Sequence, residues 1–61
     1  MIVEVEINNV VAGPSPYIVA RYAKETLSWW YYGRYDTQER ADEVRDTLNG
    51  NNEAAIVLKK I

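Results

Sequence analysis

The feature that most constrains the fold is a run of large aromatic residues in the middle of the chain. Residues 29–35 read Trp-Trp-Tyr-Tyr-Gly-Arg-Tyr and hold five of the seven aromatic side chains. Trp and Tyr favour β-strands, in which successive side chains point to opposite faces of the sheet. One small core cannot take rings from both faces, so one face is expected to need a partner. The two expected sets are Trp29, Tyr31 and Tyr35 on one face, and Trp30, Tyr32 and Arg34 on the other.

Three more strands are predicted around this aromatic strand. Positions 1–7 alternate apolar and acidic residues, which predicts a half-buried strand with its Glu face in water. The segment 13–16 is a loop because its two prolines cannot donate to a sheet ladder. Residues 17–23 are rich in β-formers, and the short connection 24–26 predicts a hairpin with the aromatic strand. Residues 54–61 predict a last strand.

One helix is predicted after the aromatic strand. Asp36 at the N-cap with Glu39 three residues later matches a capping box, and Thr37 is the alternative cap. The helix is expected to run to about Leu48, and Asn49–Gly50 offers the left-handed stop that helices commonly use. A thin apolar stripe marks its buried side and consists of Ala41, Val44 and Leu48.

The element order therefore predicts a single α+β domain over residues 1–61, with order β-β-β-α-β. We expect a four-stranded, mostly antiparallel sheet with one helix packed on one face. A right-handed crossover through the helix makes the third and fourth strands parallel, either adjacent or with one strand between them. Because the helix stripe is thin, much of the core must come from the sheet itself.

The composition leaves little for catalysis or metal binding. The chain has no Cys and no His, so it lacks thiolate ligands, a Cys nucleophile and the usual general base. Ser15 and Ser28 have no recognisable base partner. The acidic helix residues do not follow a calcium-loop order, and pairs such as Asp42–Arg45 and Arg40–Glu43 favour a solvated face. We therefore expect a non-enzymatic protein without cofactor or metal.

The chain also gives no signal for a membrane or a secretory route. Its N-terminus lacks a basic start and a continuous apolar region, so it does not read as a signal peptide. No stretch approaches the roughly 20 apolar residues of a membrane span. A cytoplasmic location is the default expectation.

Every aromatic residue is Tyr or Trp, the types that are enriched at interfaces because a ring carries a polar tip. We therefore predict a protein-interaction domain that forms a homodimer through an aromatic face of the sheet. Which face points inward stays open, because Ile18, Ala20 and Tyr22 compete with Tyr17, Val19 and Ala23. The predicted interface residues are Tyr22, Trp30, Tyr32 and Arg34.

Two alternatives remain at this point. The segment 29–41, an aromatic strand followed by Gly-x-Tyr-Asp-Thr and a capped helix, resembles small uncharacterised proteins of phages and prophages. That resemblance implies an inhibitor or adaptor in a bacterial cytoplasm that docks on a host or phage protein, and it transfers no functional residues. The second alternative is single-stranded nucleic-acid binding, with bases stacked on the rings and phosphates held by Arg21 and Arg34. A net charge of −2 disfavours it.

Overall fold

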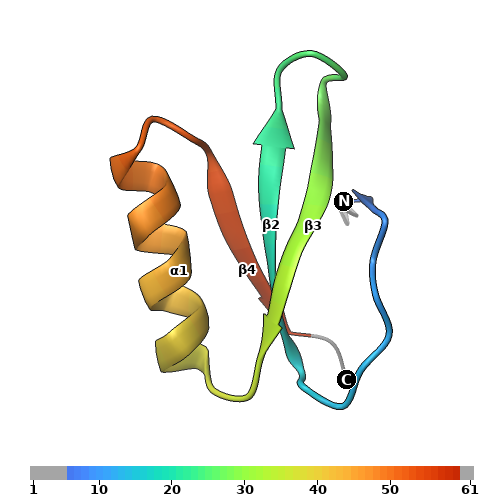
Figure 1. The fold of residues 1–61 in the computed structure, drawn as a ribbon, viewed down its shortest axis with the longest axis vertical. Helices are drawn as coiled ribbons and strands as arrows, with labels where there is room; N and C mark the ends of the chain where they lie inside the picture. Colours follow the sequence, from blue (N-terminus) through green and yellow to red (C-terminus); the bar gives the residue numbers. More distant parts are fainter. Residues whose placement is uncertain (1–5, 60–61) are drawn as a thin grey trace, which may run out of the picture.

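The fold is a four-stranded sheet with one helix against one side, in a computed structural model that describes residues 6–59 (Figure 1). The sheet order is β1-β3-β2-β4, so the long hairpin forms its centre. β1 pairs parallel with β3, and the other pairings are antiparallel. The predicted α+β class and β-β-β-α-β order are confirmed. The bounds are Ile7–Asn8 for β1, Tyr17–Ala23 for β2, Ser28–Tyr35 for β3, Gln38–Gly50 for α1 and Ala55–Lys59 for β4.

The third and fourth strands are parallel with one strand between them, which is one of the two predicted arrangements. β2 pairs antiparallel with both β3 and β4, so β3 and β4 run in the same direction with β2 between them. The helix makes the return connection along one side of the sheet (Figure 1). Of the first predicted strand, 1–7, positions 1–5 lie outside the described residues, as do 60 and 61 of the last strand.

The β2–β3 hairpin forms as expected, although its turn is one residue longer than predicted. The turn covers residues 24–27, and β3 begins at Ser28. Leu27 adopts a left-handed conformation with φ of 53° and is 76% exposed. An exposed Leu in this region of φ is unfavourable, so the pairing of the flanking strands must hold the turn in place.

A β-bulge in β3 overturns the predicted division of its side chains. Val19 pairs with Gly33 and Ala20 pairs with Tyr31, which leaves Tyr32 as the extra residue opposite that step. Beyond a bulge the alternation changes phase, because two residues of one strand oppose one residue of the other. Arg34 therefore shares a face with Trp29 and Tyr31, and Tyr35 shares the opposite face with Trp30.

The helix begins and ends at slightly different residues than the sequence suggests. Thr37 is the N-cap, and its hydroxyl accepts the backbone N–H of Arg40 at 3.2 Å. Asp36 instead accepts a hydrogen bond from the Ser15 hydroxyl. The predicted stop at Asn49–Gly50 is wrong, since α1 includes Gly50 and the left-handed residue is Asn52, with φ of 63°.

The predicted helix stripe packs against one face of the sheet. Ala41 and Leu48 are buried, and Val44 packs beside them. They meet Val19 of β2 and Ala55 of β4, and Val19 is completely buried. This contact settles the inward direction on the helix side in favour of Tyr17 and Val19. The other candidates, Ile18 and Ala20, are also buried, but they lie on the opposite face of β2.

Candidate interaction surfaces

The sheet face turned away from α1, here called the open face, is formed mainly by apolar and aromatic side chains of the described strands. Cross-strand partners share a face, so the register fixes its members. Eight of the nine described positions carry apolar or aromatic side chains. The open face consists of Ile7, Ile18, Ala20, Tyr22, Trp29, Tyr31, Arg34, Ile56 and Leu58.

An aromatic pair occupies one end of the open face. The rings of Tyr22 and Trp29, which are cross-strand partners, meet edge to face with centroids 5.2 Å apart. This geometry is one of the two that aromatic pairs favour. Both rings, together with Tyr31, are half-buried. The end of the hairpin therefore presents fixed rings with part of their surface still accessible.

Arg34, the one charged member of the open face, is engaged within the chain. Its guanidinium donates hydrogen bonds to the carbonyl oxygens of Val11 and Ser15, at 2.5 and 2.8 Å. A Cβ added at Gly13 would lie 3.2 Å from the Arg34 Cδ, so the chain passes closely over this side chain. Arg34 thus fastens residues 9–16, here called the strap, to β3. The predicted interface arginine acts in the structure as an internal hydrogen-bond donor.

The four predicted interface residues do not share one surface. Tyr22 and Arg34 lie on the open face, whereas Trp30 pairs with Arg21 on the helix side. The Trp30 indole N–H donates to the Thr26 hydroxyl at 3.0 Å. Tyr32, at the bulge, is 49% exposed. Strict alternation grouped Trp30, Tyr32 and Arg34 together, and the bulge separates them.

Trp29 and Tyr31 are the open-face residues that sequence reasoning assigned to the other group. The available signal was Gly33, because a glycine inside a strand often marks a bulge or a close approach. A Cβ at Gly33 would lie only 2.7 Å from the Tyr35 hydroxyl oxygen. The missing side chain therefore makes room for the Tyr35 ring on the helix side.

A shallow groove lies between the bulge and the helix. Its volume is about 270 Å³, and it is lined by Tyr32 and Tyr35 on one side and α1 on the other. Val44 and Leu48 provide apolar lining, while Arg40 and Glu43 pair with each other at 3.5 Å. Burial, followed by the nearby Tyr32, raises the pKa of the Tyr35 phenol. Tyr35 therefore stays neutral at physiological pH. The two charges in the groove, those of Arg40 and Glu43, are paired with each other.

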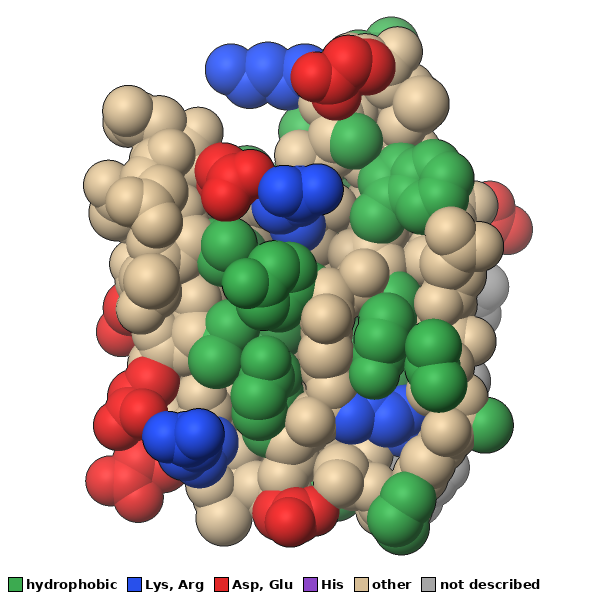
Figure 2. Space-filling view, viewed as in Figure 1, with side chains coloured by type: hydrophobic (Ala, Val, Ile, Leu, Met, Phe, Trp, Pro, Cys, Tyr) green, Lys and Arg blue, Asp and Glu red, His purple; other side chains and the backbone are tan. Residues whose placement is uncertain are grey.

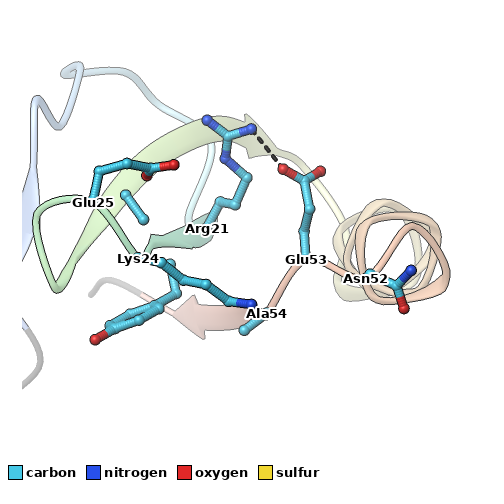
Figure 3. A pocket seen from close by; sticks show the side chains of 8 residues that line it. Arg21, Lys24, Glu25, Asn52, Glu53 and Ala54 are labelled. Atoms are coloured by element: carbon cyan, nitrogen blue, oxygen red, sulfur yellow. Dashed lines mark hydrogen bonds and ion pairs between the residues drawn. The ribbon is translucent and has the colours of Figure 1, made fainter.

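A second depression of about 250 Å³ lies between the hairpin turn and the segment before β4. Arg21 and Glu53 reach toward each other from its two sides and form an ion pair at 2.8 Å (Figure 3). Lys24 and Glu25 add one charge of each sign. Because positive and negative side chains are balanced here, the depression does not select a ligand of either sign.

The charged side chains gather elsewhere. In the space-filling view, acidic side chains lie along the helix at the left, and hydrophobic side chains lie over the strands (Figure 2). Two helix pairs have the predicted i,i+3 spacing, Arg40–Glu43 and Arg45–Asp42 at 3.3 Å.

Within residues 6–59 no group of three or more potential ligands is arranged to hold a metal ion, and α1 is not long and apolar enough to cross a membrane. Comparison with protein-family models, curated proteins and solved structures gave no significant match.

Proposed function

We propose that this protein is a non-enzymatic interaction domain that self-associates by packing its open face against the open face of a second copy. The observation that carries the proposal is the composition of that face, on which Arg34 is the only charged residue among those that the structure describes. An antiparallel sheet covered on one side only is expected to alternate apolar and polar residues. Here both sides are apolar, and α1 packs on one of them.

A second copy is a suitable occupant because the open face complements itself chemically. An isologous contact places apolar and aromatic side chains against the same types. Arg34 already donates to two carbonyl oxygens, and these hydrogen bonds offset part of the cost of covering its charged guanidinium. Val10 and Val11 of the strap are 39% and 56% exposed, so the strap adds apolar surface that a second copy can contact.

The size of the face sets the strength of the contact. Seven residues at about 3.3 Å along β2, and three strands about 4.8 Å apart, give a planar footprint of roughly 300 Å². The area free for a partner is smaller, because Ile18 and Ala20 within this footprint are already buried in the single chain. A standard stable interface buries about 800 Å² per partner. We therefore expect a dimer that dissociates in the micromolar range or above, rather than a permanent one.

The contacts of the basic residues give nucleic-acid binding no support. Arg21 pairs with Glu53, and Arg34 donates to backbone carbonyls. Phosphate contacts would have to compete with both interactions.

The self-association proposal is tested by sedimentation equilibrium from about 1 μM to 1 mM, across which the average mass should rise above that of the 7.0-kDa chain. A constant monomer mass over the whole range would refute it.

A further inference from the structure

The side of the sheet that carries α1 is only partly covered by that helix. In Figure 1, α1 lies toward the β4 edge, and the core beneath it contains Val19 of β2 and Ala55 of β4. A helix with its side chains is about 10 Å wide and strands lie about 4.8 Å apart, so one helix covers about two strands. The sheet has four, in the order β1-β3-β2-β4. A strip along β3 is therefore left beside α1.

Three aromatic side chains of β3 form the floor of this strip, here called the aromatic ledge: Trp30, Tyr32 and Tyr35. Trp30 and Tyr35 are half-buried, and Tyr32 is 49% exposed. Figure 2 shows hydrophobic side chains lying over the strands beside the helix. Two ledge residues, Trp30 and Tyr32, were predicted at an interface from the sequence, and the open face contains neither of them.

The ledge accepts apolar side chains more readily than polar ones. The Trp30 indole N–H already donates to the Thr26 hydroxyl at 3.0 Å, so a partner that covers the ring need not supply an acceptor for it. The groove of about 270 Å³ joins the ledge to α1, and Val44 and Leu48 add apolar lining there. A partner is therefore expected to bring apolar side chains to the floor.

The helix wall of the ledge carries a net negative charge. Between Gln38 and Gly50, α1 has four acidic and two basic residues, and both basic residues pair with acids of α1 itself. Glu43 lines the groove, and the exposed Glu39 and Asp46 lie beside it on the helix surface. Within residues 6–59, Glu39 has no ion-pair partner. The wall therefore favours a partner with basic side chains next to α1.

The shape of the ledge favours a helix over an extended segment. The floor offers side chains, so an extended segment lying on it would leave backbone N–H and C=O groups without partners, whereas a helix satisfies its own. Trp30 and Tyr35 are five positions apart, which is about 16 Å of strand and about 11 residues, or three turns, of helix. A helix of three or four turns therefore spans the floor.

We propose that the aromatic ledge binds an amphipathic helix of a partner protein, with its apolar face on the rings and Lys or Arg on the flank next to α1. A second copy is a poor occupant, because α1 is the one helix of residues 6–59 and would set two acidic helices side by side. The ledge and the open face lie on opposite sides of the sheet, so this inference does not depend on self-association.

The test uses a synthetic Trp-free peptide of about 14 residues, with Leu along one helical face and Lys on the flanks. One control peptide has Glu in place of Lys, and the other keeps the composition but spreads Leu around the helix. The Trp29→Phe variant retains only Trp30, and the first peptide should protect this Trp from acrylamide quenching. Both controls should bind at least about tenfold more weakly. Equal binding by either control would overturn the proposal.

Two charge substitutions separate the ledge from the open face. Tyr32→Lys should weaken binding of the Lys peptide at least about tenfold, because it adds a positive charge to the floor. Tyr31→Lys is the matched control on the open face, and it should leave peptide binding unchanged while it weakens self-association. Unchanged peptide affinity of a folded Tyr32→Lys variant would refute the ledge as the binding site, and self-association through the open face would stand.

Amide chemical shifts of the unmodified protein give a reading that needs no substitution. The Lys peptide should shift the amide signals of Tyr32 and Thr47, which line the groove, and leave those of Ala20 and Ile56 as they are without peptide at the same protein concentration. Shifts confined to the open face would overturn the ledge as the site. Protection of Trp30 that rises with protein concentration alone would make a second copy the occupant, and would also overturn the proposal.

Discussion

The two faces of the sheet differ in what completes them. On the helix side, Val19, Ala41, Leu48 and Ala55 form a closed core within one chain. On the open face, Ile18 and Ala20 are buried, while the surrounding Tyr22, Trp29 and Tyr31 are half-buried. One helix supplies enough apolar surface for one face only. The comparison teaches that α1 closes the core of the first face, whereas the second face, which we propose to bind a second copy, keeps partly accessible rings around two buried residues.

The largest effect is expected from damage to the helix-side core. Leu48→Ala should lower the free energy of unfolding by about 3 kcal/mol, because it removes a buried side chain and leaves a cavity. For a chain of this length the total is roughly 3–9 kcal/mol, so the variant should be largely unfolded or close to it. Urea denaturation followed by Trp fluorescence measures the change. Thr47→Ala, at an exposed neighbouring position, should stay within about 0.5 kcal/mol of the parent.

A substitution on the open face should change association more than stability. Tyr31→Lys should weaken self-association at least tenfold, or about 1.4 kcal/mol, because association would bury a charge. Tyr32→Lys is the matched control, since the bulge places Tyr32 outside the paired register of the open face. Sedimentation velocity of both variants measures how much each substitution weakens self-association. Equal weakening by the two substitutions would show that the bulge does not separate their roles.

Gly33 tests the local geometry beside the bulge, and Gly50, in α1, is its control. Gly33→Ala should cost about 1–3 kcal/mol, because its Cβ would meet the Tyr35 ring, which packs against the core. Gly50→Ala should be neutral or stabilise by up to about 1 kcal/mol, because nothing lies within 4 Å of the new Cβ and Ala favours the helix. Thermal unfolding of both variants measures the difference. Equal stability of the two would contradict the close contact at Gly33.

The smallest effect concerns pH. Burial raises the Tyr35 pKa in the folded chain, so above the ordinary Tyr pKa of about 10 the unfolded chain loses its proton first. Stability contributed by the neutral phenol is therefore present below pH 10 and is lost as the pH rises through the folded-state pKa. Unfolding midpoints between about pH 9 and 11 should fall less steeply for Tyr35→Phe than for the parent. Identical slopes of the unfolding midpoint against pH in the two proteins would show that Tyr35 does not contribute to the pH dependence of stability.

Much of the fold could be predicted from the sequence because its elements carry local signals. The run of β-formers before a short turn gave the hairpin, and Ala41, Val44 and Leu48 gave the buried side of α1. The crossover rule then gave parallel β3 and β4. These features depend on residue spacing within one element, or on chain connectivity, and both are visible in a sequence.

The candidate surface was harder to predict because it depends on register. A single bulge at Tyr32 changes the face of every later residue in β3, and strict alternation cannot anticipate it. Arg34 was expected at an interface as a charged neighbour of exposed rings. Its two hydrogen bonds to the strap join positions 23 and 19 residues apart, which no local pattern indicates. The sequence thus predicts the aromatic strand, and the structure divides its rings between the faces.

The two tryptophans provide the most direct test of the central claim, because Trp29 lies on the open face and Trp30 on the helix side. The measurement is acrylamide quenching of the single-Trp variants Trp30→Phe and Trp29→Phe over a dilution series. The account predicts that Trp29 becomes more protected from quenching as concentration rises, while Trp30 stays constant. Protection of Trp30 alone, or of neither residue in an associated sample, would contradict self-association through the open face.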